Sequence, residues 1–122
     1  LALLEKANLD AKLKNYDEAL YNFNELIMLT DGARDNKIFN KISRVSASRI
    51  LLSLERYDEA LSMIEKYSLG DTNAPIHELA GDILFKQGKV NLAINQYEAA
   101  EEKYTDQTSK SIISMKIASI SN

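Results

Sequence analysis

The chain has 122 residues, a formal net charge of −3 at pH 7 and no cysteine. This length suffices for one domain with a core, and the hydrophobic content of 45% is ordinary for a globular protein. The acidic balance disfavours a nucleic-acid binder, which normally carries a basic face, and the lack of cysteine excludes disulfides and thiolate metal sites. With one proline and four glycines the chain has few helix breakers, so we expect a high helix content.

The chain opens with a predicted pair of helices over about residues 1–31. Apolar periodicity predicts the first helix over residues 1–14 and the second over residues 17–29, with Gly32 as a stop signal. Leu1 lies inside an apolar pattern without a capping residue before it. We therefore expect a fragment of a longer chain, in which any signal peptide or anchor would lie upstream.

A second pair of helices is predicted over about residues 35–69, with a long helix over 35–54 and a shorter one over 58–67. The pentapeptide Tyr-Asp-Glu-Ala-Leu occurs at Tyr16–Leu20 and again at Tyr57–Leu61. Because internal repetition decides the architecture, these two copies indicate an array of repeated helix pairs.

A third pair is predicted over about residues 74–105. Its first helix spans about residues 75–87, with Asn73 or Thr72 as a candidate cap, and its second spans about 90–104. Gly88 between them can take the left-handed conformation that ends a helix without a steric penalty. The third pair therefore repeats the helix–turn–helix plan of the first two.

Small and aromatic residues recur at matching places in these pairs. Ala19, Ala60 and Ala93 are 41 and 33 residues apart, and the second gap matches the period of helical-pair repeats. Gly81 and Ala93 are expected to face each other where the helices of the third pair cross, and Tyr97 is expected to fill the space beside them.

A last helix is predicted over about residues 107–120, with Asp106 as its candidate cap. Ile113, Ile117 and Ile120 share one face of this helix. An array of repeats needs such a terminal helix, apolar inward and polar outward, to cover its last pair.

With these residues the whole chain resembles tetratricopeptide repeat proteins. The resemblance implies an all-α fold, a right-handed α-solenoid of three tetratricopeptide-like helix pairs plus a C-terminal capping helix, in a single repeat domain over residues 1–122. The chain departs from the family pattern at Lys14-Asn15 and Glu55-Arg56, where glycine is usual, and at Val90, where an aromatic residue is usual.

More specific strings occur between Lys41 and Ile120. They are Arg49–Leu52, Tyr57–Leu61, Glu78–Leu84, Gln87-Gly88, Ala93, Tyr97, Ala100 and Met115–Ile117. With these strings the chain is similar to the bacterial translocon-ancillary (YfgM-like) tetratricopeptide family. The resemblance implies the periplasmic domain of an inner-membrane adaptor that acts beside the secretion translocon and periplasmic chaperones, with its membrane anchor upstream of this chain. The resemblance supplies no catalytic residue, and we expect no cofactor. We expect no metal site either, because the single histidine, His77, has no cysteine and no second histidine to bind a metal with it.

In such arrays the first helix of each pair lines a concave groove that binds segments of other proteins. We therefore expect a protein or peptide segment as partner, one that carries both apolar anchors and charges, and no nucleic acid. The residues expected to face the groove are Asn8, Lys12, Val45, Arg49, Leu52, Glu78, Asp82, Phe85 and Lys86.

Two other functional classes are alternatives to the anchored adaptor. The alternative is a soluble tetratricopeptide adaptor or self-assembling scaffold in another compartment such as the cytoplasm, and an apolar run upstream of Leu1 would separate the two. An enzyme is disfavoured because Glu78 and Asp82 are expected on an open helical face, where nothing would raise a carboxylate pKa. The lone His77 is expected to be a surface or groove side chain.

Overall fold

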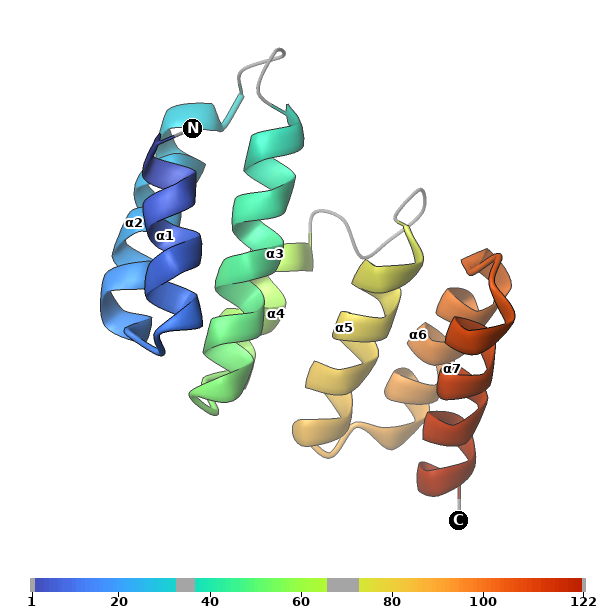
Figure 1. Ribbon diagram of the computed structural model, residues 1–122. Coiled ribbons are helices and arrows are strands. Elements are labelled where there is room, and N and C mark those ends of the chain that lie inside the picture. The colour runs from blue at the N-terminus through green and yellow to red at the C-terminus, as the bar shows by residue number, and fades with distance from the viewer. Residues whose placement is uncertain (1, 33–36, 66–72, 122) are drawn as a thin grey trace. The chain divides into compact units, whose positions relative to one another are not determined.

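The protein is described by a computed structural model that covers residues 2–32, 37–65 and 73–121. These residues form seven α-helices and no strand (Figure 1), which confirms the predicted all-α fold. Each predicted helix is present, with ends close to those expected from the sequence. The helices are α1 (Ala2–Lys12), α2 (Tyr16–Thr30), α3 (Lys37–Ser53), α4 (Tyr57–Ile64), α5 (Ala74–Lys86), α6 (Val90–Lys103) and α7 (Gln107–Ile120).

The chain divides into two compact units, Leu1–Met63 and Ile64–Asn122. We call them unit 1 and unit 2 and describe each by itself. The single repeat domain over residues 1–122 and its right-handed superhelix stay predictions. The predicted end of α4 beyond Glu65 lies outside the described residues, as do residues 70–72 of the expected loop before α5.

Unit 1 is held together by small residues that let its helices approach closely. Ala7 and Ala19 are fully buried in α1 and α2, and Phe23 fills the space between helices with no exposed surface. The Ser48 hydroxyl of α3 donates a 2.7 Å hydrogen bond to the Ala60 carbonyl of α4. The small side chains therefore set the spacing of the helix pairs, as the repeated alanines predicted.

The three hairpin turns share one backbone conformation. Lys14, Glu55 and Gly88 have positive φ angles of 61°, 61° and 81°. In each turn this residue donates to the carbonyl three residues earlier, at 2.9–3.0 Å, and the next residue donates to the carbonyl five residues earlier, at 2.7–2.9 Å. This pattern is the Schellman motif. The turns at Lys14 and Glu55 lack glycine, but they have the same hydrogen-bonded conformation as the turn at Gly88.

Unit 2 is built on the close crossing of α5 and α6. A Cβ atom at Gly81 would lie 2.6 Å from Cδ1 and Cε1 of Tyr97, a ring that is only 3% exposed. Both predicted caps form, because the Asn73 side chain accepts from the Ile76 amide at 3.3 Å and Asp106 accepts from Ser109 at 2.9 Å. Tyr97, predicted to fill the gap beside Gly81 and Ala93, is thus the side chain that lies against Gly81 itself, where Ala93 was predicted, and this contact sets the distance between the two helices.

The last helix, α7, packs its predicted apolar face on unit 2. Ile113 is fully buried, and Ile117 and Ile120 are half-buried. The opposite face carries Ile112 and Met115, which are 46% and 70% exposed. The helix therefore packs mainly on α6, and Ile113 is the fully buried residue of its apolar face.

Candidate functional site

The groove residues predicted in unit 1 lie on α1 and α3. Asn8 and Lys12 are exposed on α1, while on α3 Arg49 is exposed and Val45 and Leu52 are half-buried. This group therefore combines polar, charged and apolar side chains that solvent can reach.

A second apolar stripe runs along α3, apart from the face that packs into unit 1. Ile38 and Ile42 are 72% and 40% exposed, and Val45, Arg49 and Leu52 continue the stripe at alternating steps of four and three residues. Residues at these steps lie on one side of a helix. The stripe extends the predicted groove surface toward the start of α3 through Ile42 and Ile38.

Arg49 is the one charged side chain in this α3 stripe. It has no hydrogen-bond or ion-pair partner among residues 2–32, 37–65 and 73–121. A guanidinium flanked by apolar side chains is a residue arrangement that frequently dominates binding energy when a partner covers it.

The groove residues predicted in unit 2 lie on α5 and divide into two kinds. Phe85 is 39% exposed and Lys86 is exposed. Glu78 and Asp82 are only half exposed, because their carboxylates bind other side chains of unit 2. The expectation of an open acidic face at Glu78 and Asp82 was therefore wrong, since α6 and α7 cover it.

Three side chains converge on these two carboxylates. The Lys116 ammonium lies 2.6 Å from Glu78 Oε2 and 3.0 Å from Asp82 Oδ1. The Tyr97 hydroxyl donates to Asp82 Oδ1 at 2.6 Å, and the Tyr104 hydroxyl donates to Glu78 Oε1 at 2.6 Å. We call these five residues the ionic cluster. It joins all three helices of unit 2.

The protonation of the ionic cluster follows from its burial and charges. Burial lowers the pKa of Lys116, but the hydrogen bonds and charges of Glu78 and Asp82 outweigh burial and raise that pKa above its ordinary value of 10.5. Burial, and then the hydrogen bond to Asp82, raises the pKa of Tyr97 above its ordinary value of 10.0. Lys116 is therefore a cation and Tyr97 a neutral donor at neutral pH.

Replacing Lys116 by methionine is expected to destabilise unit 2. The substitution keeps most of the unbranched side chain but leaves the two carboxylates without a cation, at a cost of about 1–3 kcal/mol. Equilibrium urea unfolding measures this loss. Lys103→Met, an exposed lysine in the last turn of α6, is the matched control and is expected to change stability little.

The difference in unfolding free energy between the wild type and Lys116→Met is expected to depend on pH. Since the pKa of Lys116 is raised in the folded state, its contribution is complete below the unfolded-state value and is lost as pH rises through the folded-state value. The difference between the wild type and Lys116→Met is thus expected to be constant from neutral pH to about pH 10 and to shrink above it. A difference that already shrinks between pH 7 and 9 would show that Lys116 is not the cation of the cluster.

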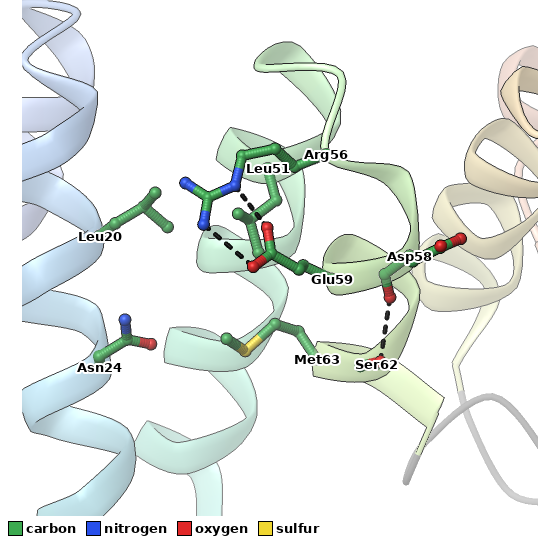
Figure 2. Close-up of a pocket in the computed structure, with 8 residues that line it drawn as sticks. All are labelled: Leu20, Asn24, Leu51, Arg56, Asp58, Glu59, Ser62 and Met63. Atoms are coloured by element: carbon green, nitrogen blue, oxygen red, sulfur yellow. Dashed lines mark hydrogen bonds and ion pairs between the residues drawn. The ribbon is translucent and has the colours of Figure 1, made fainter.

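A pocket of about 330 Å³ opens between α2 and α4 in unit 1, on helices that the groove prediction did not include. Figure 2 shows Leu20 and Asn24 of α2 pointing toward Arg56, Glu59 and Met63. We call it the α2–α4 pocket. Its lining residues are Leu20, Asn24, Leu51, Arg56, Asp58, Glu59, Ser62 and Met63.

The α2–α4 pocket has an apolar floor and a charged rim. Leu20 and Leu51 are buried beneath it, and Arg56 at its rim binds the Glu59 carboxylate through two guanidinium nitrogens. This hydrogen bond lowers the pKa of Glu59. The pocket therefore offers an apolar hole edged by fixed charges.

The sequence contained a signal for the α2–α4 pocket. Its lining includes Leu20 from the first Tyr-Asp-Glu-Ala-Leu copy, and Asp58 and Glu59 from the second. The repeat indicated that two equivalent helices would be neighbours. It did not indicate that their side chains leave a hole, because that depends on packing.

The remaining features to consider in the part of the chain that the structure describes are the histidine, possible metal ligands and possible membrane-spanning helices. His77 is only 4% exposed, with Nδ1 2.8 Å from the Gln96 amide oxygen, so the expected surface or groove histidine is a buried one. No group of three or more His, Asp or Glu side chains in the described residues could hold a metal ion. None of the described helices combines the length and the hydropathy that crossing a membrane requires.

Comparison with known proteins identified one family. A family model described as "Tetratricopeptide repeat-like domain" matches residues 1–122. No curated protein and no solved structure matched the chain.

Proposed function

We propose that this chain, which belongs to the tetratricopeptide repeat-like family, is an adaptor protein. The first helix of each pair, α1, α3 and α5, binds a segment of another protein. Domains of this family are generally non-catalytic modules for protein interaction. In keeping with the resemblance to the translocon-ancillary family, the finer proposal is the periplasmic part of an inner-membrane adaptor beside the secretion translocon and its chaperones.

The α3 stripe is the observation that carries the binding proposal. Arg49 stands exposed and unpaired among the described residues, with Val45 and Leu52 beside it on the same helix face. Apolar anchors around a guanidinium suit an amphipathic helix or an extended segment that presents apolar side chains and a carboxylate.

The ionic cluster limits which of the predicted groove residues on α5 can bind the partner segment. Glu78 and Asp82 already bind Lys116, so a partner cation would have to displace it. On α5 the proposal therefore rests on Phe85 and Lys86, which solvent reaches.

Replacing both Arg49 and Phe85 by alanine is expected to abolish partner capture. Each is the type of residue that costs about 2 kcal/mol or more when a well-buried contact is truncated. Neither is a core residue, so the helical circular dichroism signal should stay unchanged. The measurement is photo-crosslinking from Val45 and Leu52 in bacterial cell envelopes, followed by identification of the captured proteins.

A matched control separates the groove from the rest of the surface. Leu92→Ala with Lys103→Ala removes an exposed apolar and an exposed basic side chain from α6, and capture should persist. If the Arg49 and Phe85 double variant still captures the partner, the groove is not the binding site. Capture of proteins unrelated to secretion would overturn the translocon proposal while leaving the groove intact.

A further inference from the structure

The α3 stripe has the spacing of one side of a coiled coil. Its residues, Ile38, Ile42, Val45, Arg49 and Leu52, follow one another at steps of four, three, four and three. This is the alternation of the a and d positions in a heptad repeat. Ile38 and Ile42 are 72% and 40% exposed, and Arg49 is exposed between the half-buried Val45 and Leu52. The stripe therefore presents the pattern on which a second helix packs.

The step along the α3 stripe matches a helix and not an extended chain. Neighbouring stripe residues lie on average about 5.2 Å apart along the axis of α3, so Ile38 to Leu52 spans about 21 Å. A helix lying along α3 presents its own a and d residues at the same step. A strand presents side chains to one face about every 6.6 Å, so over the length of the stripe it falls out of register by about 5 Å, one whole step. A helix can therefore use the full stripe, and a strand cannot.

The charge of α3 favours an acidic partner. The helix carries four basic residues and no acidic one, although the whole chain has a net charge of −3. Arg44 binds Asp31, whereas Arg49 has no partner among the described residues. Lys12, the basic groove residue predicted on α1, is likewise exposed and has no partner in the described ranges. A helix that covers Arg49 without offering a carboxylate would leave the guanidinium buried and unpaired, which is costly.

We infer that the α3 stripe binds an amphipathic helix of the partner protein, which lies along α3 and places a glutamate or aspartate opposite Arg49. Apolar side chains at the partner's a and d positions pack on Ile38, Ile42, Val45 and Leu52. A single charged residue at a core position fixes the register of a helix pair. Arg49 therefore sets the register and rejects a helix with lysine or arginine at that place. The inference rests on the proposed function and names the class of segment that the groove binds.

An anionic membrane surface fits the α3 stripe less well. Apolar side chains that enter a lipid interface must project from their helix, but Val45 and Leu52 are half-buried. A partner helix can reach both, because its side chains enter the spaces between those of α3.

Synthetic peptides of known conformation test the inference. The first is a side-chain-stapled helix of about two heptads, with leucine at its a and d positions and glutamate at one central a position. The second has the same composition in the alternating order of a strand. The third is the stapled helix with lysine in place of the glutamate. In fluorescence anisotropy, the glutamate helix should bind the chain at least about tenfold more tightly than either of the other peptides.

Substitutions in the α3 stripe assign the contact. Arg49→Glu should reverse the preference, so that the lysine helix binds more tightly than the glutamate helix. Circular dichroism should stay unchanged, because Arg49 is exposed. Ile42→Ser should weaken binding of the glutamate helix about tenfold. Its matched control, Leu92→Ser on α6, where the leucine is 52% exposed, should not.

Three results with the peptides would overturn the helix as ligand: equal affinity of all three, tighter binding of the strand-patterned peptide, or no binding of any. An Arg49→Glu variant without the reversed preference would overturn it as well. Wild-type binding to phosphatidylglycerol vesicles that Arg49→Glu abolishes, with no peptide competing, would assign the stripe to a membrane instead. Partner capture is read separately. If capture is lost in the Arg49 and Phe85 double variant while the peptides fail, the groove remains the binding site and its ligand is not a helix.

Discussion

Replacing Gly81 by leucine is expected to destabilise unit 2 by about 1–3 kcal/mol or more. A Cβ atom alone would lie 2.6 Å from two carbons of the Tyr97 ring, and leucine adds three further carbons. The ring cannot swing aside cheaply, since it is buried and its hydroxyl donates to Asp82. Thermal or urea unfolding measures the loss.

The milder substitution Gly81→Ala is a sharper test, because helix propensity and the contact with Tyr97 change the stability in opposite directions. Inside an open helix, glycine to alanine stabilises by about 1 kcal/mol. Here the contact with Tyr97 should outweigh that gain. The double variant with Tyr97→Ala, which removes the ring, should recover part of the loss in a double-mutant cycle. A stabilised Gly81→Ala protein would contradict the assigned crossing, and Ala118→Leu on the exposed side of α7 serves as the control for added volume.

Truncating Ile113 to alanine is expected to cost about 2–5 kcal/mol and to loosen α7. Ile113 is fully buried, whereas the adjacent Ile112 is 46% exposed. Ile112→Ala makes the same chemical change one residue away in the same helix, so helix propensity cancels in the comparison. Urea unfolding and limited proteolysis of α7 measure the difference.

The Ile113 comparison also tests whether α7 is a cap. If it is, Ile113→Ala should expose apolar surface of α5 and α6 and raise aggregation, while Ile112→Ala should not. Equal behaviour of the two variants would mean that α7 is held by Lys116 and the ionic cluster more than by its isoleucine.

Local spacing in the sequence was sufficient to predict the helices and the small residues that are buried where they cross. The recurrence of Ala19, Ala60 and Ala93 placed small residues where helices cross, and all three are fully buried. The sequence also predicted a close crossing at Gly81 with Tyr97 beside it, although it placed Ala93 opposite Gly81, where the structure has the Tyr97 ring. Helix ends followed from caps such as Asn73 and Asp106.

Long-range polar contacts were not predictable in this way. Lys116 is 38 residues from Glu78, its partner in the ionic cluster, and no local pattern specifies that pairing. The same holds for the α2–α4 pocket, which exists because Leu20 and Leu51 leave space unfilled. His77 was misplaced because a single polar residue in a helix gives no indication of whether a neighbour such as Gln96 will bury it.

The shared hairpin turn has a consequence for how such repeats diverge and are detected. Lys14 and Glu55 hold a left-handed backbone that costs a non-glycine residue roughly 1–2 kcal/mol, yet their hydrogen bonds match those at Gly88. The helix pairing therefore imposes this geometry, and mutation can replace the glycine without changing the turn. A search pattern that demands glycine here would recognise one of these three turns, whereas the alanine at the crossing marks all three.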